Sequence, residues 1–181
     1  MFGLPLAASI RNGAQKSALL SLGPKVYLEI MGPDRSQPES PQPRPFGMDT
    51  MVKPRLATWV ARTDDVQSII DTARQHKLDL GELQAGSRQR PDGSTLKWKM
   101  TDLTKDREGG IVPYFIDWGD SPHPAESSPK GCRLTALEGF HPDAGKINEI
   151  FRDLGLDFQA QHGIVAFRAT IESPRGRMVL E

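Results

Sequence analysis

Two segments of the sequence repeat each other at a constant offset of 78 residues, which carries Asp65 onto Asp143. We call residues 65–80 the first copy and residues 143–158 the second copy. The matching positions are Asp65, Ile69, Ala73, Leu78, Asp79 and Leu80 in the first copy and Asp143, Ile147, Phe151, Leu156, Asp157 and Phe158 in the second. Self-similarity at such a period is typical of duplicated supersecondary units that bury their apolar faces against each other. The sequence therefore predicts a unit of strand, helix and further strands that is used at least twice.

Each copy is predicted to be a helix flanked by strands. Thr63, Asp64 and Asp65 supply capping side chains at the start of the first copy. Apolar residues then recur at helical spacing, which predicts a helix that ends near His76. Short apolar runs predict strands before the two copies, over 56–61 and 134–137, and after them, over 96–100, 111–118, 164–171 and 178–180.

The run 96–100 has the two-residue period of a half-buried strand. Leu96, Trp98 and Met100 alternate with Lys97 and Lys99. Because successive side chains of a strand point to opposite faces, we expect a tryptophan face in the core and a lysine face in solvent.

Two proline-rich segments separate the predicted units. So many prolines in residues 31–55 exclude a helix and remove donors for strand pairing, so this segment is expected to be an extended crossover. Residues 120–131 are expected to form a second crossover at the surface. We therefore expect one domain in three parts: an incomplete first module and crossover (1–55), a βαββ module (56–120), and a crossover with a final βαββ module (121–181).

The charge balance excludes several classes of partner. Lysine plus arginine and aspartate plus glutamate each number 23, so no net field draws the chain to nucleic acid or to an anionic membrane. Residues 1–10 lack the charged start and long apolar run of a signal peptide, and we expect a soluble, cytoplasmic protein. The single Cys132 forms no intrachain disulfide, and packing is its expected role.

Several longer runs resemble a known family. They are Ala18-Leu-Leu-Ser-Leu-Gly23 with Tyr27-Leu-Glu-Ile30, Gly86-Ser-Arg-Gln-Arg-Pro-Asp-Gly93, and Gly110-Ile-Val-Pro-Tyr-Phe-Ile-Asp-Trp-Gly119. Over about residues 17–176 the chain resembles the glyoxalase-like domain of the vicinal oxygen chelate superfamily. The resemblance implies an α+β fold in which repeated βαβββ modules form curved mixed sheets with helices on the outer face. It also implies a half-open barrel whose concave side holds a small molecule and often a divalent metal.

The start of the chain departs from the family pattern. The family begins with a strand and a helix before the Ala-Leu-Leu strand, whereas only residues 1–16 stand there in this chain. An incomplete first module would leave an open sheet edge, which favours pairing with a second copy of the chain as a homodimer.

The resemblance implies candidate ligands for a divalent metal such as Zn, Mn, Ni or Fe. Glu29 matches the strand-borne glutamate of the family, and Asp117 lies near the end of a later strand. Thr58 stands where the family pattern has a histidine, and it is a candidate for substrate binding. A divalent ion needs two or three converging oxygen or imidazole ligands. The other interpretations are a solvated outward charge for Glu29 and a strand-end cap for Asp117.

Further residues are candidates for substrate binding. Arg88 and Arg90 lie beside Lys97 and Lys99 around one predicted hairpin, either as a solvated face or as a clamp for an anion. Trp118 is expected in the core or against a planar ligand, and His123 is a candidate lid contact in the second crossover.

Three functions are compatible with these residues. The first is a lyase or isomerase acting on a small oxygenated metabolite, with Glu29 as proton acceptor and Asp117 as its partner. The second is a non-catalytic module that binds a small molecule without a metal. The third is an assembly role through the open sheet edge.

Overall fold

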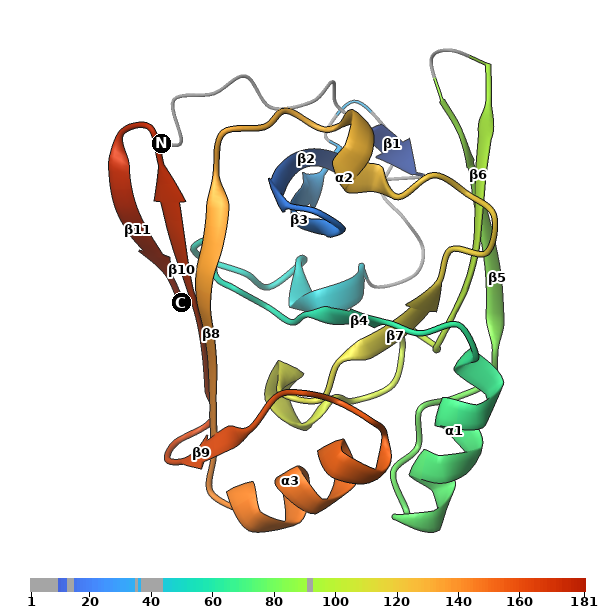
Figure 1. Cartoon of the computed structure of the whole chain (residues 1–181), viewed down its shortest axis with the longest axis vertical. Helices are drawn as coiled ribbons and strands as arrows, with labels where there is room; N and C mark the ends of the chain where they lie inside the picture. The colour runs from blue at the N-terminus through green and yellow to red at the C-terminus, as the bar shows by residue number, and fades with distance from the viewer. Residues whose placement is uncertain (1–9, 13–14, 35, 37–43, 91–92) are drawn as a thin grey trace. The chain divides into compact units, whose positions relative to one another are not determined.

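The structure is a computed structural model that describes residues 10–12, 15–34, 36, 44–90 and 93–181. Its strands are β1 (Ile10–Asn12), β2 (Gln15–Gly23), β3 (Val26–Pro33), β4 (Val60–Arg62), β5 (Gln84–Gln89), β6 (Thr95–Met100), β7 (Tyr114–Asp117), β8 (Arg133–His141), β9 (Ala160–His162), β10 (Ala166–Ser173) and β11 (Gly176–Leu180). The α-helices are α1 (Val66–Gln75), α2 (Pro124–Ser127) and α3 (Ala144–Asp153), and short 3-10 turns are η1 (Pro45–Gly47) and η2 (Glu108–Gly110). Figure 1 shows these elements along the chain.

The strands form three sheets, with the orders β1-β2-β3, β4-β7-β6-β5 and β11-β10-β8-β9. The second and third sheets are mixed, because β4 pairs with β7 and β8 with β9 in parallel while β5 pairs with β6 and β10 with β11 in antiparallel fashion. This arrangement confirms the predicted α+β class with mixed sheets.

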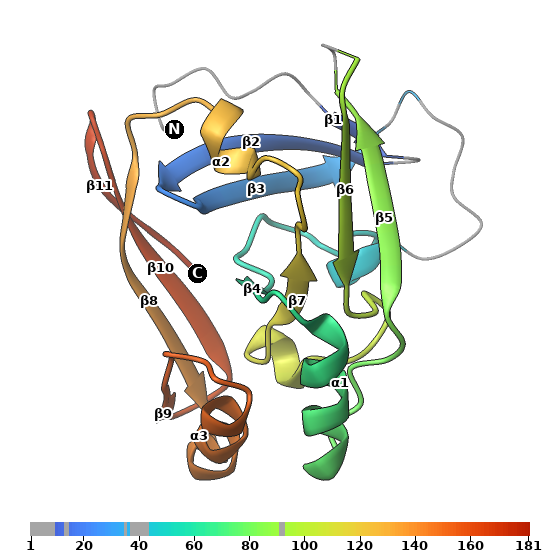
Figure 2. The ribbon, with the colours of Figure 1, turned by 45° about the vertical axis from the view of Figure 1, so that its right-hand side comes forward.

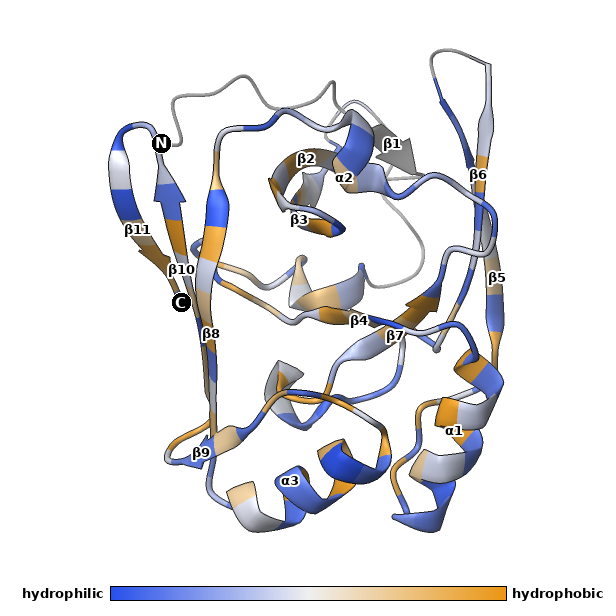
Figure 3. Cartoon of the chain, in the orientation of Figure 1, coloured by the Kyte–Doolittle hydropathy of each residue, from blue (hydrophilic) through white to orange (hydrophobic). Residues whose placement is uncertain are grey.

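The repeat in the sequence is a repeat in the structure. Helices α1 and α3 have ten residues each, and the offset of the sequence repeat carries one onto the other from first residue to last. The second copy connects two parallel strands directly, β8 to β9 through α3. In the first copy β4 also pairs in parallel with a later strand, β7, but β5 and β6 stand between α1 and β7 in the chain. In Figure 3 both helices carry apolar and polar residues in alternating stripes, as expected for helices with one buried side.

The chain divides into two compact units. The first unit is Met1–Leu56, His123–Leu137 and Arg168–Glu181, and the second is Ala57–Pro122 and Glu138–Phe167. In the first unit, Leu20, Leu22 and Ile171 pack with Cys132. Burial raises the pKa of the Cys132 thiol, which agrees with the packing role expected for it.

The second unit has an aromatic core. The Trp59 ring lies 4.8 Å from Phe158, 6.2 Å from Phe167 and 6.4 Å from Phe151 between ring centroids. Its indole nitrogen donates to the carbonyl of Ile111 at 2.8 Å, so the polar end of this half-buried tryptophan also has a partner.

Several predicted boundaries were wrong. Strand β7 begins at Tyr114 rather than residue 111, because Ile111 has helical backbone angles (φ −72°, ψ −37°) and Pro113 has no N–H to donate. Helix α2 was not foreseen, and β5 was expected only as the unbounded first arm of the hairpin around Arg88 and Arg90. The predicted turn at Pro91 and Asp92, and residues 37–43 of the first crossover, lie outside the described residues.

The second proline-rich segment is not simply a surface crossover. It contains α2, and Pro124, Ala125 and His123 are buried.

Among the helices in the part of the chain that the structure describes, none is long and apolar enough to cross a membrane.

Candidate functional site

The β5–β6 hairpin of the second unit gathers several predicted site residues. Gly86 pairs with Trp98 and Arg88 with Leu96 in antiparallel register, so these four residues share one side of the hairpin. We call this side, with the following Arg90, the tryptophan face. Lys97 and Lys99 are exposed on the opposite side, as the sequence predicted. Figure 2 shows β5 and β6 as a long pair of strands beside β7.

The two arginines of the tryptophan face are half-buried. The backbone of Arg90 continues the hairpin, since its N–H donates to the Ser94 carbonyl at 2.7 Å. Its side chain is less well satisfied, because Nη2 is buried and has no hydrogen-bond partner among the residues that the structure describes. A buried guanidinium N–H without an acceptor is costly, so this atom is a candidate contact for an anionic ligand.

The Trp98 ring packs against Gly86 and lies beside the Trp118 ring. A β-carbon built on Gly86 would overlap the Trp98 indole, so the ring lies directly against the strand backbone. The Trp118 ring lies 5.5 Å away between centroids, tilted by 58°. The importance of Gly86 was missed at the level of sequence, although a hairpin centred on residues 91–93 pairs it with Trp98.

Asp117 lies on the other side of the sheet from Trp98. It pairs with Lys99 across β6 and β7, so it shares the lysine side. Its Oδ1 accepts a hydrogen bond from the Gly119 N–H at 2.7 Å. This geometry agrees with the strand-end cap that was one of its two interpretations.

Thr58 makes a structural contact. Its hydroxyl donates to the Gly110 carbonyl at 3.3 Å. Gly110 has φ of +97°, and a β-carbon there would overlap the Ala57 carbonyl. The close approach of these two backbones explains why a glycine and a small hydroxyl residue stand at these positions.

Glu29 and His123 belong to the first unit. Glu29 is exposed on β3, at the edge of the β1-β2-β3 sheet, on the same side as Tyr27. The Tyr27 and His123 rings meet edge to face at 5.5 Å between centroids. The His123 Nδ1 accepts from the Ala125 N–H at 3.3 Å at the start of α2, and His123 is 9% exposed. The His123 imidazole is thus packed and caps a turn of helix, and its role as a lid contact stays a prediction.

Among the residues that the structure describes, no three His, Cys, Asp or Glu side chains form a group that fits a metal ion. Glu29 belongs to the first unit and Asp117 to the second, and the Asp117 carboxylate caps its own turn. The divalent metal site that the resemblance implied stays a prediction.

Comparison with known proteins identifies the family. A solved structure of a hypothetical protein from Staphylococcus aureus is 11% identical, with a TM-score of 0.55 over 99% of this chain and 77% of that chain, which shows a shared fold. No curated protein matches the sequence. The glyoxalase-like domain profile matches residues 8–155, including both copies of the repeated helix. The chain therefore belongs to the glyoxalase-like domain family, as the sequence predicted.

Proposed function

We propose that the chain binds a small oxygenated metabolite with a negative charge on the tryptophan face of the β5–β6 hairpin. One observation carries this proposal: the Arg90 Nη2 is buried without a hydrogen-bond acceptor among the described residues. Leaving such a donor unsatisfied costs about 1–3 kcal/mol, and a ligand oxygen would remove this cost. The vicinal oxygen chelate fold, which binds small molecules, supports this assignment.

Arg88 completes the recognition of the anion. It lies two residues before Arg90 on the same side of β5, and no hydrogen bond or ion pair of its side chain is found in the described part of the chain. A guanidinium presents two parallel N–H groups to a carboxylate or phosphate, and such charge-assisted bonds are stronger than neutral ones. Two arginines on one half-buried face therefore favour an oxyanion over a neutral ligand.

The test compares the two sides of one hairpin. Thermal unfolding is measured with sodium acetate, benzoate and phosphate on the unaltered protein, on an Arg88→Gln/Arg90→Gln variant and on a Lys97→Gln/Lys99→Gln control. We expect at least one anion to raise Tm in the unaltered protein and the control, because a ligand stabilises the state that it binds. The arginine variant should weaken that binding by about 10- to 100-fold.

Two results would contradict the proposal. One is equal stabilisation of the arginine variant and the control, which would indicate unspecific charge screening. The other is that no anion raises Tm of the unaltered protein, even at anion concentrations high enough to saturate a weak small-molecule site.

A second candidate function is catalysis by Glu29. Its carboxylate is exposed, has no ion pair or hydrogen bond among the described residues, and shares a side of the sheet with Tyr27. A carboxylate in this state can accept a proton from a carbon beside a carbonyl, which is the first step of an isomerase or lyase. Solvent deuterium exchange into pyruvate, followed by NMR, tests this role. Equal exchange rates with the unaltered protein and Glu29→Gln would exclude it for this probe.

A further inference from the structure

We infer that the ligand of the tryptophan face is planar and conjugated, such as an aromatic carboxylate. This inference rests on the proposed function and adds the shape of the ligand to its charge. It follows from the arrangement of Gly86, Trp98 and Trp118. These residues are uncharged, so they select the shape of a ligand rather than its charge.

Gly86 allows the Trp98 indole to lie directly against β5. The atoms that a β-carbon on Gly86 would overlap are Cε2, Nε1 and Cζ2, which lie along the N–H edge of the indole. This edge therefore contacts the glycine backbone, and the side chain remains half-buried rather than fully covered. The part of the indole that stays exposed is an apolar surface of the kind on which planar groups stack.

Trp118 forms a wall beside this surface. Its ring is tilted by 58° relative to the Trp98 ring at a centroid distance of 5.5 Å. Offset and edge-to-face arrangements are the favoured geometries of aromatic pairs, so a planar ligand on one ring would meet the edge or face of the other. A tetrahedral or bulky ligand gains less from such a corner.

The spacing of the hairpin joins this corner to the arginines. Arg88 follows Gly86 by two residues on the same side, which is about 7 Å along a strand. The residue opposite Arg88 is Leu96, which is 1% exposed and therefore belongs to the core rather than to the surface that a ligand can reach. A ring stacked on Trp98 would therefore direct a carboxylate substituent toward Arg88 and Arg90.

The side chains of Arg88 and Arg90 make no stacking contact with the Trp98 indole in the described part of the chain. A guanidinium can itself stack on a tryptophan. In the described part of the chain, the cation–π contact that is found joins Arg107 and Tyr114, and Trp98 has none. Among the described residues, no cation therefore stacks on Trp98, and the Arg90 Nη2 is a buried donor without an acceptor.

The experiment uses two probes that differ only in shape. Benzoate and cyclohexanecarboxylate have the same charge and nearly the same size, but only benzoate is planar. Binding of each is measured by titration calorimetry to the unaltered protein and to Trp98→Leu, Arg90→Gln and Lys99→Gln. We expect benzoate to bind the unaltered protein about three- to tenfold more tightly than cyclohexanecarboxylate. Trp98→Leu should remove this preference, Arg90→Gln should weaken both probes, and Lys99→Gln should change neither.

The outcomes separate the shape of the ligand from its charge. Equal affinities for the two probes in the unaltered protein, with both still weakened by Arg90→Gln, would overturn the planar ligand and leave anion binding intact. Failure of both carboxylates to bind in an Arg90-dependent manner would overturn the proposed function and this inference together. The comparison of probes on the unaltered protein needs no variant, so it stands even if Trp98→Leu fails to fold.

Gly86→Ala provides a second variant that keeps the indole. The added β-carbon must displace the Trp98 ring from its position on the strand. We expect the benzoate preference to fall while the affinity for cyclohexanecarboxylate changes little. An unchanged preference in a folded Gly86→Ala protein would contradict the role of the flat indole.

Discussion

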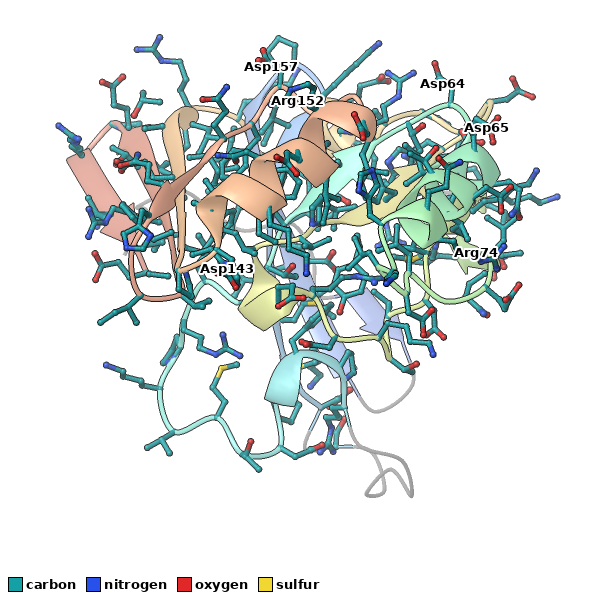
Figure 4. All side chains as sticks on the ribbon, turned by 90° about the horizontal axis from the view of Figure 1, so that it is seen from below. Asp64, Asp65, Arg74, Asp143, Arg152 and Asp157 are labelled. Atoms are coloured by element: carbon teal, nitrogen blue, oxygen red, sulfur yellow. The ribbon has the colours of Figure 1, made fainter. Side chains whose placement is uncertain are left out.

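The two copies of the repeated helix share a backbone and differ in what holds them. Two residues after the end of each helix the backbone turns into the left-handed region, at Lys77 with φ of 60° and at Gly155 with φ of 70°. The closing hydrogen bonds also match: Lys77 N to Arg74 O and Leu78 N to Ala73 O in the first copy, Gly155 N to Arg152 O and Leu156 N to Phe151 O in the second. Figure 4 labels Arg74 and Arg152, the basic residues in the last turns of these helices. The duplicated sequence thus preserves a helix and its ending.

The second copy is held by aromatic rings. Phe151 and Phe158 stand at the positions of Ala73 and Leu80 in the first copy, and both rings contact Trp59. Phe151 is 1% exposed. The larger side chains of the second copy therefore fill its core directly.

The first copy is held by a buried charge. Arg107 is 2% exposed, and its guanidinium donates to the carbonyls of Asp79 and Leu80 at 3.3 Å and of Asp102 at 2.9 Å. The same group lies 4.3 Å from the centre of the Tyr114 ring. Burial lowers the pKa of Arg107, and the tyrosine ring and nearby carboxylates oppose that shift. One arginine thus fixes the segment after α1, where the second copy uses Phe158.

The largest expected effect comes from emptying the aromatic core of the second copy. Phe151→Ala should lower the free energy of unfolding by about 3–5 kcal/mol, because it leaves a cavity beside the rings of Trp59 and Phe158. Phe151→Leu is the matched control and should lose less than half as much. Urea denaturation followed by circular dichroism measures both. A loss below about 1 kcal/mol for Phe151→Ala would show that the rings do not hold this copy.

Replacing Arg107 tests in the same way what stabilises the first copy. Arg107→Lys keeps the charge but cannot reach three carbonyls from one planar group, and we expect a loss of about 2–4 kcal/mol. The control is Arg152→Lys in the last turn of α3, an exposed arginine that should change stability by less than about 0.5 kcal/mol. Equal losses of stability for Arg107→Lys and Arg152→Lys would contradict the idea that the buried Arg107 guanidinium stabilises the fold more than a surface arginine does.

The sequence could predict the shared backbone but not these different interiors. The helix positions followed from the repeat, and the Leu96, Trp98 and Met100 alternation correctly separated the two sides of β6. The bounds of β5 were not predicted because its residues Gln84–Gln89 have little apolar character, and the strand is held by pairing with β6. Local pattern carries no information about such pairing.

The ligand side of the hairpin was only partly foreseeable. An arginine is expected at the surface, so the sequence gives no reason to bury Arg107 or the Nη2 of Arg90. The buried Arg107 guanidinium, for example, is bonded to Asp79 and Leu80, which are distant in the chain. Glu29 and Asp117 were paired by family pattern alone, and the geometry around Asp117 agrees better with a cap.

The starts of the two helices offer a smaller and sharper contrast. The Asp65 carboxylate accepts from the Ser68 N–H at 3.0 Å, whereas Asp143 makes no side-chain cap, although both stand at the same position of the repeat. In the second copy it is the Asp143 N–H that donates, to His141 Nδ1 at 3.1 Å. Asp65→Ala should lower stability by about 1 kcal/mol and Asp143→Ala by a few tenths at most. Similar losses for both would mean that charge near the helix start, rather than the hydrogen bond, is what stabilises.

The smallest expected effect concerns the aspartate that follows each helix, and it depends on pH. A hydrogen bond from Lys105, whose Nζ lies 2.7 Å from Oδ2, holds the pKa of Asp79 below its usual value of 3.8, and the Gly81 N–H adds to this shift. A lowered pKa in the folded state means that the contribution of Asp79 to stability is complete well above pH 4 and is lost as the pH falls through its folded value.

The matching Asp157 has no ion pair among the residues that the structure describes, so it is the control. We expect Asp79→Asn to be less stable than the unaltered protein at pH 7, and this difference should shrink as the pH falls below about 4. Asp157→Asn should show no such trend. Urea denaturation midpoints of the unaltered protein and both variants, measured at a series of pH values, show whether only the aspartate of the first copy makes a pH-dependent contribution to stability. A difference for Asp79→Asn that stayed constant down to acid pH would mean that the lysine contact is too well solvated to distinguish the first copy from the second.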